Sequence, residues 1–412
     1  MSKPVNAVCC YTFDILRKYQ RRMYSIIKYF WFVIICLSLS ACSSETAPKA
    51  WTFVSMPDFL NVDCDYPQIG WEESLEYILT AVKKEDPDFL MVPGDLVMGH
   101  WDDASWNSQD TIEKYADRYY SAWKSRMNRH ELAYYTAVGD HELGDNPWRD
   151  TAKVATIPFY RAAFRKHLQM PLNGPWHLPG TAFWWKHKGV LFISVDVFED
   201  GESDQGAIKA GVSGKQLRWM EDIFLANQDA KYRIVMGHTP ILGPVRKWSS
   251  SGLMIKEGRD APLWQCMKKY NVDAYLCGEA HAITCTERDN IMQIAHGGLI
   301  GYNTRTNYLV VTVEANRLTL EIKEIELMPS GDHLWQTKNN RPLKRVDIVD
   351  PVKGFYTVAK AVLVRDGPEK FIDRIGYFKP EYEFSTDQAA PIFRKGSRPG
   401  IVTELPKIIA GQ

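Results

Sequence analysis

Side chains that can bind metal ions recur in this sequence directly after short apolar stretches typical of β-strands. They are Asp58, Asp95, the run Asp140-His141-Glu142, His238, and Glu279 with His281. Carboxylates and imidazoles are common protein ligands of divalent cations. Because the carboxyl ends of parallel strands meet at one edge of a sheet, we expect these side chains to gather there. The pattern favours one metal site over five unrelated turns.

The elements that must position these residues alternate between strands and helices. Strands are predicted at residues 51–56, 88–92, 133–138, 190–195, 233–236 and 273–277. Helices are predicted at residues 71–84, 111–128, 214–227 and 262–270. Consecutive strands then follow at residues 291–295, 308–313 and 318–325. This order predicts an α/β fold in which two packed sheets are flanked by helices.

The motifs resemble, in the same order, those of the calcineurin-like metallophosphoesterases. That family carries D-x-H, G-D, G-N-H-[DE], H and G-H-x-H, each at a strand end. The corresponding stretches here are Asp58-Phe59-Leu60, Gly94-Asp95, Gly139-Asp140-His141-Glu142, Gly237-His238 and Gly278-Glu279-Ala280-His281. The resemblance covers about residues 50 to 300. It implies a four-layer αββα sandwich and a hydrolase that acts on phosphoester bonds.

The resemblance also implies a ligand set for two divalent metal ions. By it, Asp95 bridges both ions, and Asp58 and His281 complete the first position. Asp140, His238 and Glu279 hold the second position. Two such ions about 4 Å apart can clamp a phosphoryl group and activate a bridging hydroxide. The implied reaction is attack of that hydroxide on a small phosphorylated substrate, either a phosphomonoester or a phosphodiester.

The resemblance gives catalytic roles to two further residues. His141 would not bind metal but would assist the leaving-group oxygen, and Glu142 would orient the imidazole ring of His141. The alternative is a catalytically inactive envelope lipoprotein that uses the same cleft for ligand binding. The presence of His141 favours the enzyme, since a purely structural metal site needs no acid at that position.

Three positions depart from the family pattern. Leu60 stands where the family has His, Asp140 where Asn is usual, and Glu279 where the first His of the last motif belongs. Asn61 and Asp63, on the loop after Asp58, are possible substitute ligands, and Asp65 is a third choice.

The departures change the charge of the predicted site. Four carboxylates replace the usual two, so the ligands alone would neutralise two divalent cations. Oxygen ligands favour hard cations. We therefore predict Mn, Mg or Fe rather than Zn, a weaker attraction for phosphate dianions, and a possible preference for monoanionic diesters.

The N-terminus reads as a targeting segment. A basic flank, a short apolar run and small residues predict a signal peptide over residues 1–41. Leu39-Ser40-Ala41-Cys42 resembles the lipobox of bacterial lipoproteins, so Cys42 is the predicted lipidation site, and residues 42–50 read as a tether. A plain secretory signal is the alternative. The expected location is the bacterial cell envelope, periplasmic or at the outer surface, with a lipid anchor in the membrane.

Composition and pattern define the remaining regions. The chain has 412 residues, of which 45% are hydrophobic and 24% charged, as in globular proteins. Residues 1–41 hold six bases and one acid, which leaves 44 bases and 49 acids in the rest. A mildly acidic body predicts no nucleic-acid partner. We expect a metallophosphoesterase domain at residues 51–328 and a β-rich extension of unassigned role at residues 329–412.

Overall fold

The computed structural model describes residues 49–59, 70–97, 108–247, 250–298, 305–330, 345–365 and 369–380, together with residues 22, 23 and 28. The chain divides into two units, Met1–Lys49 and Ala50–Gln412, and the fold below is that of the second unit. Within the described ranges, no helix is both long and apolar enough to cross a membrane. Cys42, Leu60, Asn61, Asp63 and Asp65 lie outside the described residues.

The first sheet joins the two ends of this unit. Its strands are β1 (Trp51–Ser55), β2 (Leu90–Val92), β3 (Tyr134–Thr136), β12 (Arg305–Val313), β13 (Arg317–Ser330), β15 (Tyr356–Val364) and β16 (Phe371–Gly376), with β14 (Arg345–Ile348) paired to β13. The order across the sheet is β16-β15-β13-β12-β1-β2-β3. Strands β1, β2 and β3 are parallel, whereas β12 is antiparallel to β1.

The second sheet contains the middle part of the chain. Its strands are β4 (Phe183–His187), β5 (Val190–Ser194), β8 (Tyr232–Met236), β9 (Ala274–Cys277), β10 (Thr284–Arg288) and β11 (Ile291–Ala295). The order is β10-β11-β9-β8-β5-β4, and β5, β8, β9 and β11 run parallel. A separate hairpin is formed by β6 (Phe198–Ser203) and β7 (Gly206–Ala210).

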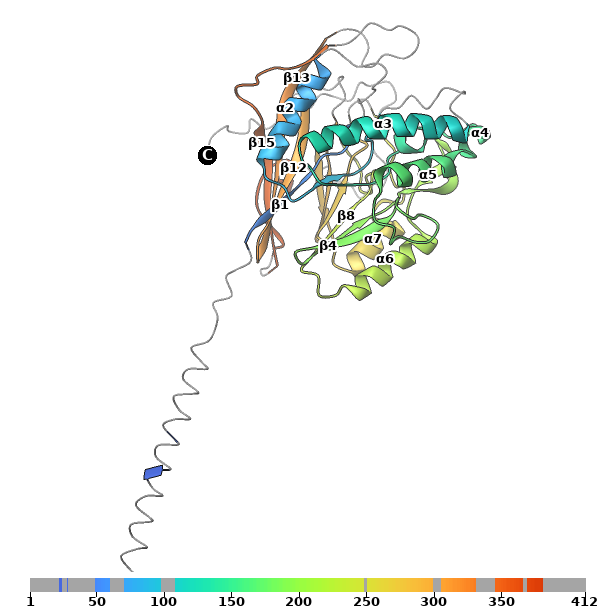
Figure 1. The fold of residues 1–412 in the computed structure, drawn as a ribbon. Coiled ribbons are helices and arrows are strands. Elements are labelled where there is room, and N and C mark those ends of the chain that lie inside the picture. The colour runs from blue at the N-terminus through green and yellow to red at the C-terminus, as the bar shows by residue number, and fades with distance from the viewer. Residues whose placement is uncertain are drawn as a thin grey trace, which may run out of the picture. The chain divides into compact units, whose positions relative to one another are not determined.

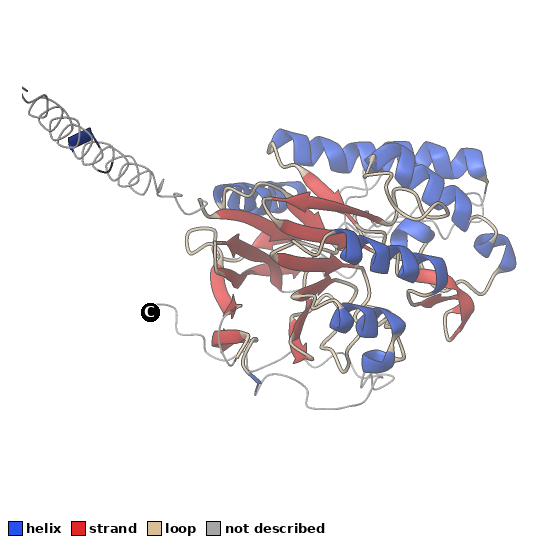
Figure 2. Cartoon of the chain, turned by 90° about the horizontal axis from the view of Figure 1, so that it is seen from below, coloured by secondary structure: helices blue, strands red, loops and turns tan. Residues whose placement is uncertain are grey.

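Helices lie outside the strands, as Figure 2 shows. They are α2 (Trp71–Lys84), α3 (Gln109–Arg129), α4 (Thr151–Val154), α5 (Ile157–Leu168), α6 (Gly214–Ala226) and α7 (Pro262–Lys269), with 3₁₀ turns η2 (His141–Leu143) and η3 (Gly258–Asp260) (Figure 1). In α2, Leu75, Ile78, Leu79 and Val82 are buried, which confirms the helical spacing read from the sequence. The four-layer αββα fold with β-rich C-terminal strands is thus the predicted one.

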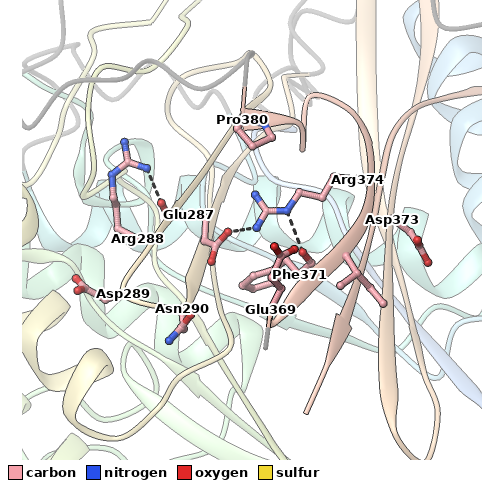
Figure 3. Close-up of a pocket in the computed structure, with 10 residues that line it drawn as sticks. Glu287, Arg288, Asp289, Asn290, Glu369, Phe371, Asp373, Arg374 and Pro380 are labelled. Carbon is pink, nitrogen blue, oxygen red and sulfur yellow. Dashed lines mark hydrogen bonds and ion pairs between the residues drawn. The ribbon is translucent and has the colours of Figure 1, made fainter. Parts of the chain in front are cut away.

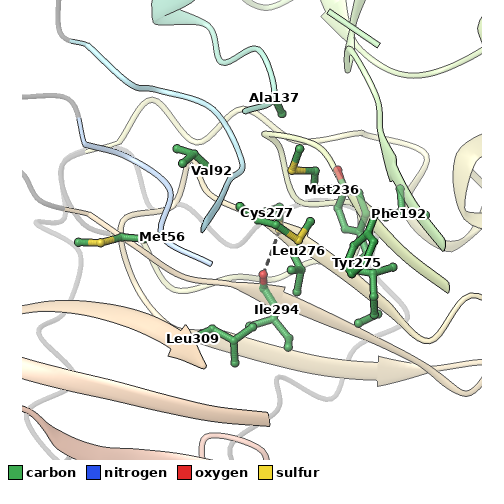
Figure 4. Packing of buried hydrophobic residues seen from close by; sticks show 14 of the residues in the cluster. Met56, Val92, Ala137, Phe192, Met236, Tyr275, Leu276, Cys277, Ile294 and Leu309 are labelled. Carbon is green, nitrogen blue, oxygen red and sulfur yellow. Dashed lines mark hydrogen bonds between the residues drawn. The ribbon is translucent and has the colours of Figure 1, made fainter. Parts of the chain in front are cut away.

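The core lies between the two sheets. Phe53 of β1 packs edge-to-face on Phe192 of β5, with ring centroids 5.3 Å apart, and Phe89 meets the same ring at the same distance. Figure 4 shows buried residues of this core, among them Phe192, Tyr275 and Ile294 of the second sheet. Burying such rings removes apolar area from water at about 25 cal/mol per Å². The paired sheets therefore form a rigid support for the loops at their edge.

Three cysteines of the described residues form no disulfide. Cys266, Cys277 and Cys285 are buried free thiols. Cys277 of β9 and Cys285 of β10 are therefore not joined by a cross-strand disulfide.

The predicted C-terminal β-rich segment continues the first sheet. Strand β13 runs through residue 329, and β15 pairs with it in an antiparallel register. Asp273, fully buried before β9, ties this segment to the second sheet. Its Oδ2 accepts from Arg365 Nη2 at 2.7 Å, and its Oδ1 lies 2.9 Å from Lys370 Nζ. These two positive charges, one just after β15 and one just before β16, thus compensate a carboxylate that burial would otherwise penalise.

A buried glutamate on β13 is expected to make stability depend on pH. Glu324 accepts from the Tyr356 hydroxyl at 3.4 Å, and burial raises its pKa from the ordinary 4.5 to about 7. The unfolded chain releases this proton at a lower pH than the folded chain does. The contribution of Glu324 to the free energy of unfolding is therefore fully present below about pH 4.5 and is lost as the pH rises towards 7. We expect the Tm of the wild-type chain to fall by a few degrees across this pH range, and the Tm of the Glu324→Gln variant to fall by less. Calorimetry at pH 5 and pH 8 measures the Tm of both proteins. An equal change in Tm between the two pH values in the two proteins would contradict the prediction.

Candidate metal centre

The structure places the six predicted ligands just past the ends of five strands. Asp58 follows β1, Asp95 follows β2, Asp140 follows β3, and His238 follows β8, while Glu279 and His281 follow β9. All six are buried, with at most 7% of any of these residues exposed to solvent. Hard ligands brought together away from water are the usual form of a metal site.

Ligand atoms of these residues form three overlapping groups, each within 4.8 Å. The groups are Asp58, Asp95 and His281; Asp95, Asp140 and His141; and Asp140, His238 and Glu279. Asp95 and Asp140 each belong to two groups, so the site is one continuous centre with room for more than one cation. The residues that come together span 224 positions of sequence from Asp58 to His281.

His238 shows how the centre is oriented. A carbonyl oxygen can only accept, so the Nδ1–H of His238 donates to the Pro93 carbonyl at 2.8 Å. Nε2 then faces carboxylate oxygens of Asp140 at 3.1 Å, Asp95 at 3.3 Å and Glu279 at 3.3 Å. Burial lowers the pKa of His238, but these carboxylates outweigh it and raise the pKa well above its usual range. An imidazole held through Nδ1, with Nε2 among carboxylates, has the arrangement of a metal ligand.

A second observation tests whether a cation fits. Asp58 Oδ1 accepts the Glu279 N–H at 3.0 Å, but the buried Oδ2 has no hydrogen-bond partner among the described residues. Burial raises the pKa of Asp58 well above its usual range. A buried carboxylate oxygen without a partner is costly. A bound cation would supply the missing partner, so the donor set fits divalent metal ions.

The backbone at four of these residues is in the left-handed region. The φ angles are 59° at Asp58, 57° at Asp95, 63° at Glu279 and 52° at His281. Non-glycine residues seldom adopt such angles, which cost about 1–3 kcal/mol each and cluster at functional sites.

The glycine before Asp140 permits the close approach of two loops. A Cβ on Gly139 would lie 2.0 Å from Asp95 Oδ1. Any larger residue would push the loop of Asp140 away from the loop of Asp95. This is the physical reason for glycine in that motif.

Glu142 fixes the same two loops. Its Oε2 accepts the N–H groups of Asp95 and Gly139, both at 2.8 Å, and its Oε1 accepts that of Leu96 at 2.9 Å. The side chain is fully buried. The sequence predicts only that Glu142 orients His141, whereas the structure gives it a further part as the link between the loops of Asp95 and Asp140.

His141 lies at the edge of the centre, 9% exposed. Its backbone N–H donates to Asp95 Oδ1 at 3.3 Å. The Nε2 atom of its ring lies 3.9 Å from carboxylate oxygens of Asp95 and Asp145. Burial lowers the pKa of His141, but Asp145, Asp95 and Asp140 outweigh it and raise the pKa to about 10. The ring therefore carries a proton next to the cluster of ligands.

Sequence reasoning missed several residues that hold the ligands in place. Asn146 Nδ2 donates to Asp140 Oδ2 at 2.6 Å, and Asp145 faces His141. The turn sequence Gly144-Asp145-Asn146-Pro147 is the signal that points to both, since polar side chains in tight turns often bond nearby groups. Ser250 and Ser251 hold Glu279, and no local pattern marks them.

A pocket of about 730 Å³ lies elsewhere, between the β10–β11 turn and β16 (Figure 3). Its lining includes Glu287, Asp289 and Arg374, and Arg374 is paired with Glu287. None of the residues of the metal centre lines it. Asp289 is likewise paired, with Arg259 and Lys268.

Comparisons with known proteins agree with this geometry. The sequence profile described as calcineurin-like phosphoesterase matches residues 68–282, slightly more than half of the chain. No curated protein matches the chain.

The chain is also similar to several solved structures. A dimetal phosphatase from Danio rerio is 12% identical, with a TM-score of 0.45 over 66% of this chain and 95% of that one. GAP50, the anchor in the inner membrane complex of Plasmodium, is 14% identical, with a TM-score of 0.40 over 73% and 90%. The NAD nucleotidase of Haemophilus influenzae is 12% identical, with a TM-score of 0.35 over 65% and 48%. On the profile match, this chain belongs to the calcineurin-like phosphoesterase family and is a metal-dependent hydrolase of phosphoester bonds.

Proposed function

We propose that the chain hydrolyses a small phosphomonoester or phosphodiester with two divalent cations bound among Asp58, Asp95, Asp140, His238, Glu279 and His281. The observation that carries the proposal is the buried Asp58 Oδ2, which lacks a partner within the described part of the chain, on a residue grouped with Asp95 and His281. Asp95 shares one group with Asp58 and His281 and another with Asp140, and its Oδ2 lies 3.3 Å from His238 Nε2, which supports its role as the bridge.

Each part of the site has a distinct task. Bound cations supply an activated water and shield the charge of the phosphoryl group. His141, protonated beside Asp95 and Asp145, donates its proton to the leaving-group oxygen. Glu142 holds the loops so that the ring of His141 and the carboxylate of Asp95 keep their separation.

The role of His141 is tested with a series of leaving groups. The His141→Ala variant is expected to lose about 10²–10⁴-fold in turnover on alkyl phosphates, whose oxygen needs a proton, and much less on nitrophenyl phosphates. The measurement is kcat for both ester classes with added Mn²⁺, beside the wild-type chain. Equal losses on both classes would remove the leaving-group role. A wild-type chain that turns over no ester with any metal would instead favour a binding protein.

We propose Mn, Mg or Fe as the metal, because four of the six ligands are carboxylates. Metal analysis of protein purified without chelator is the check. Stoichiometric, tightly held Zn would contradict this choice.

We further propose that the chain is a lipoprotein of the cell envelope, anchored through Cys42. The support is the sequence around Cys42, which is preceded by an apolar run and small residues. Incorporation of labelled fatty acid into the wild-type chain but not into Cys42→Ala is the expected result, and label in both would contradict it.

A further inference from the structure

One carboxylate of the metal centre has an unusual set of donors. Glu279 Oε1 accepts hydrogen bonds from the hydroxyls of Ser250 and Ser251, both at 2.8 Å. The same oxygen accepts the N–H groups of Gly252 at 2.8 Å and Leu253 at 3.0 Å. Four donors thus meet on a single oxygen of a residue that is 3% exposed. We name residues 250–253 the serine loop.

The two oxygens of Glu279 have different surroundings. The serine loop engages Oε1, while Oε2 lies 3.3 Å from His238 Nε2, inside the group formed with Asp140. A carboxylate held in this way offers one oxygen to a cation and cannot turn away from it. An imidazole has at most one acceptor nitrogen, so a histidine at this position would leave most of these donors without a partner.

The serine loop is held independently of the centre. Its own Gly252 N–H donates to Ser250 Oγ at 2.9 Å, and just beyond it the Ile255 N–H donates to the Pro240 carbonyl at 3.0 Å. At the start of the same connection, the buried Gln293 side chain accepts the N–H of Leu242 at 2.7 Å. These bonds fix where the connection between β8 and α7 presents its donors.

We propose that the serine loop positions Glu279 as a one-oxygen metal ligand and thereby gives the cation site of Asp140, His238 and Glu279 its affinity for Mn²⁺. The inference rests on the proposed metal centre and adds Ser250 and Ser251 to it as positioning residues. Removal of a residue that hydrogen-bonds a metal ligand usually lowers the metal affinity about 10- to 100-fold.

The first experiment measures Mn²⁺ binding by the full chain. In the Ser250→Ala/Ser251→Ala variant we expect one of two Mn²⁺ ions to bind at least about tenfold more weakly, as followed by the Mn²⁺ electron paramagnetic resonance signal. The Ser250→Thr/Ser251→Thr variant keeps both hydroxyls and is expected to keep the affinity. Ser213→Ala is the matched control, because that hydroxyl donates to Glu199, which is not among the ligands, at 2.7 Å. Unchanged Mn²⁺ affinity in the alanine variant would overturn the inference.

A second experiment separates positioning from general destabilisation. In a Glu279→His background the serine loop has no carboxylate to hold, so the two alanine replacements are expected to cost little further Mn²⁺ affinity. A tenfold loss in both backgrounds would show that the serines act through folding alone and would overturn the inference. Failure of the wild-type chain to bind Mn²⁺, Mg²⁺ or Fe²⁺ would overturn the proposed function itself. A wild-type chain that binds two ions, beside an unaffected alanine variant, would leave that function in place and remove only the inference.

Discussion

The Asp95→Asn variant is expected to lose at least about a thousandfold in turnover, which corresponds to about 4 kcal/mol of transition-state stabilisation. Asp95 is grouped with Asp58 and His281 of one proposed cation position and also with Asp140 of the other, so removal of its charge is expected to weaken both. Asparagine tolerates the φ of 57° at this position and can still accept the His141 N–H. The loss would therefore come from the missing charge and not from a changed loop.

The matched control for this variant is Asp86→Asn. Asp86 also has a positive φ, 51°, but it is exposed in the turn after α2. We expect its turnover and metal content to equal those of the wild type. Turnover at saturating Mn²⁺ and bound metal per chain are the two measurements. Less than a tenfold loss in Asp95→Asn would contradict the bridging role.

The Glu142→Gln variant is expected to lose stability and activity together. Its carboxylate accepts three backbone N–H groups, and an amide has only one oxygen to offer them. At least one buried donor is then left facing an NH₂ group, at a cost of about 1–3 kcal/mol. The Tm should fall by several degrees, and turnover by at least about a hundredfold because both loops move.

A comparison with His141→Ala identifies the part that Glu142 plays. If Glu142 holds the loops of Asp95 and Asp140, the Glu142→Gln variant binds Mn²⁺ more weakly, whereas His141→Ala binds it normally. If Glu142 acts only on the ring of His141, both variants bind Mn²⁺ as the wild type does. Glu221→Gln, which alters a surface pair with Lys269, is the control for the replacement itself.

The elements predicted from the sequence are those in which apolar residues recur at regular spacing. Helix α2 begins and ends where the apolar spacing places it, and β11 does the same. Helix α5 was missed, because Pro158 reads as a helix breaker although proline is favoured in the first turn. Strand β10, Thr284–Arg288, is rich in polar residues and takes its structure from pairing with β11.

The ligands were predictable for a similar local reason. Each follows a strand, so residue type and position together indicate the site. Their supports were not, since contacts such as Ser250 to Glu279 depend on a loop that returns across 29 positions of sequence. Asn146 is bound to Asp140 through a turn whose shape the sequence only suggests. Hydrogen bonds of this kind follow from the assembled fold and leave no periodic trace.

The position of β12 between β1 and β13 bears on when the metal centre can form during synthesis of the chain. Strand β1, which precedes Asp58, takes as its antiparallel neighbour a strand that begins at Arg305, some 250 residues later. Ribosomes release the chain from its N-terminus onwards, so β1 waits for its neighbour until most of the chain has emerged. A cation that needs Asp58 can be captured only after that moment. The metal ions present when the whole chain folds, and not those present around its first half, would therefore decide which metal it carries.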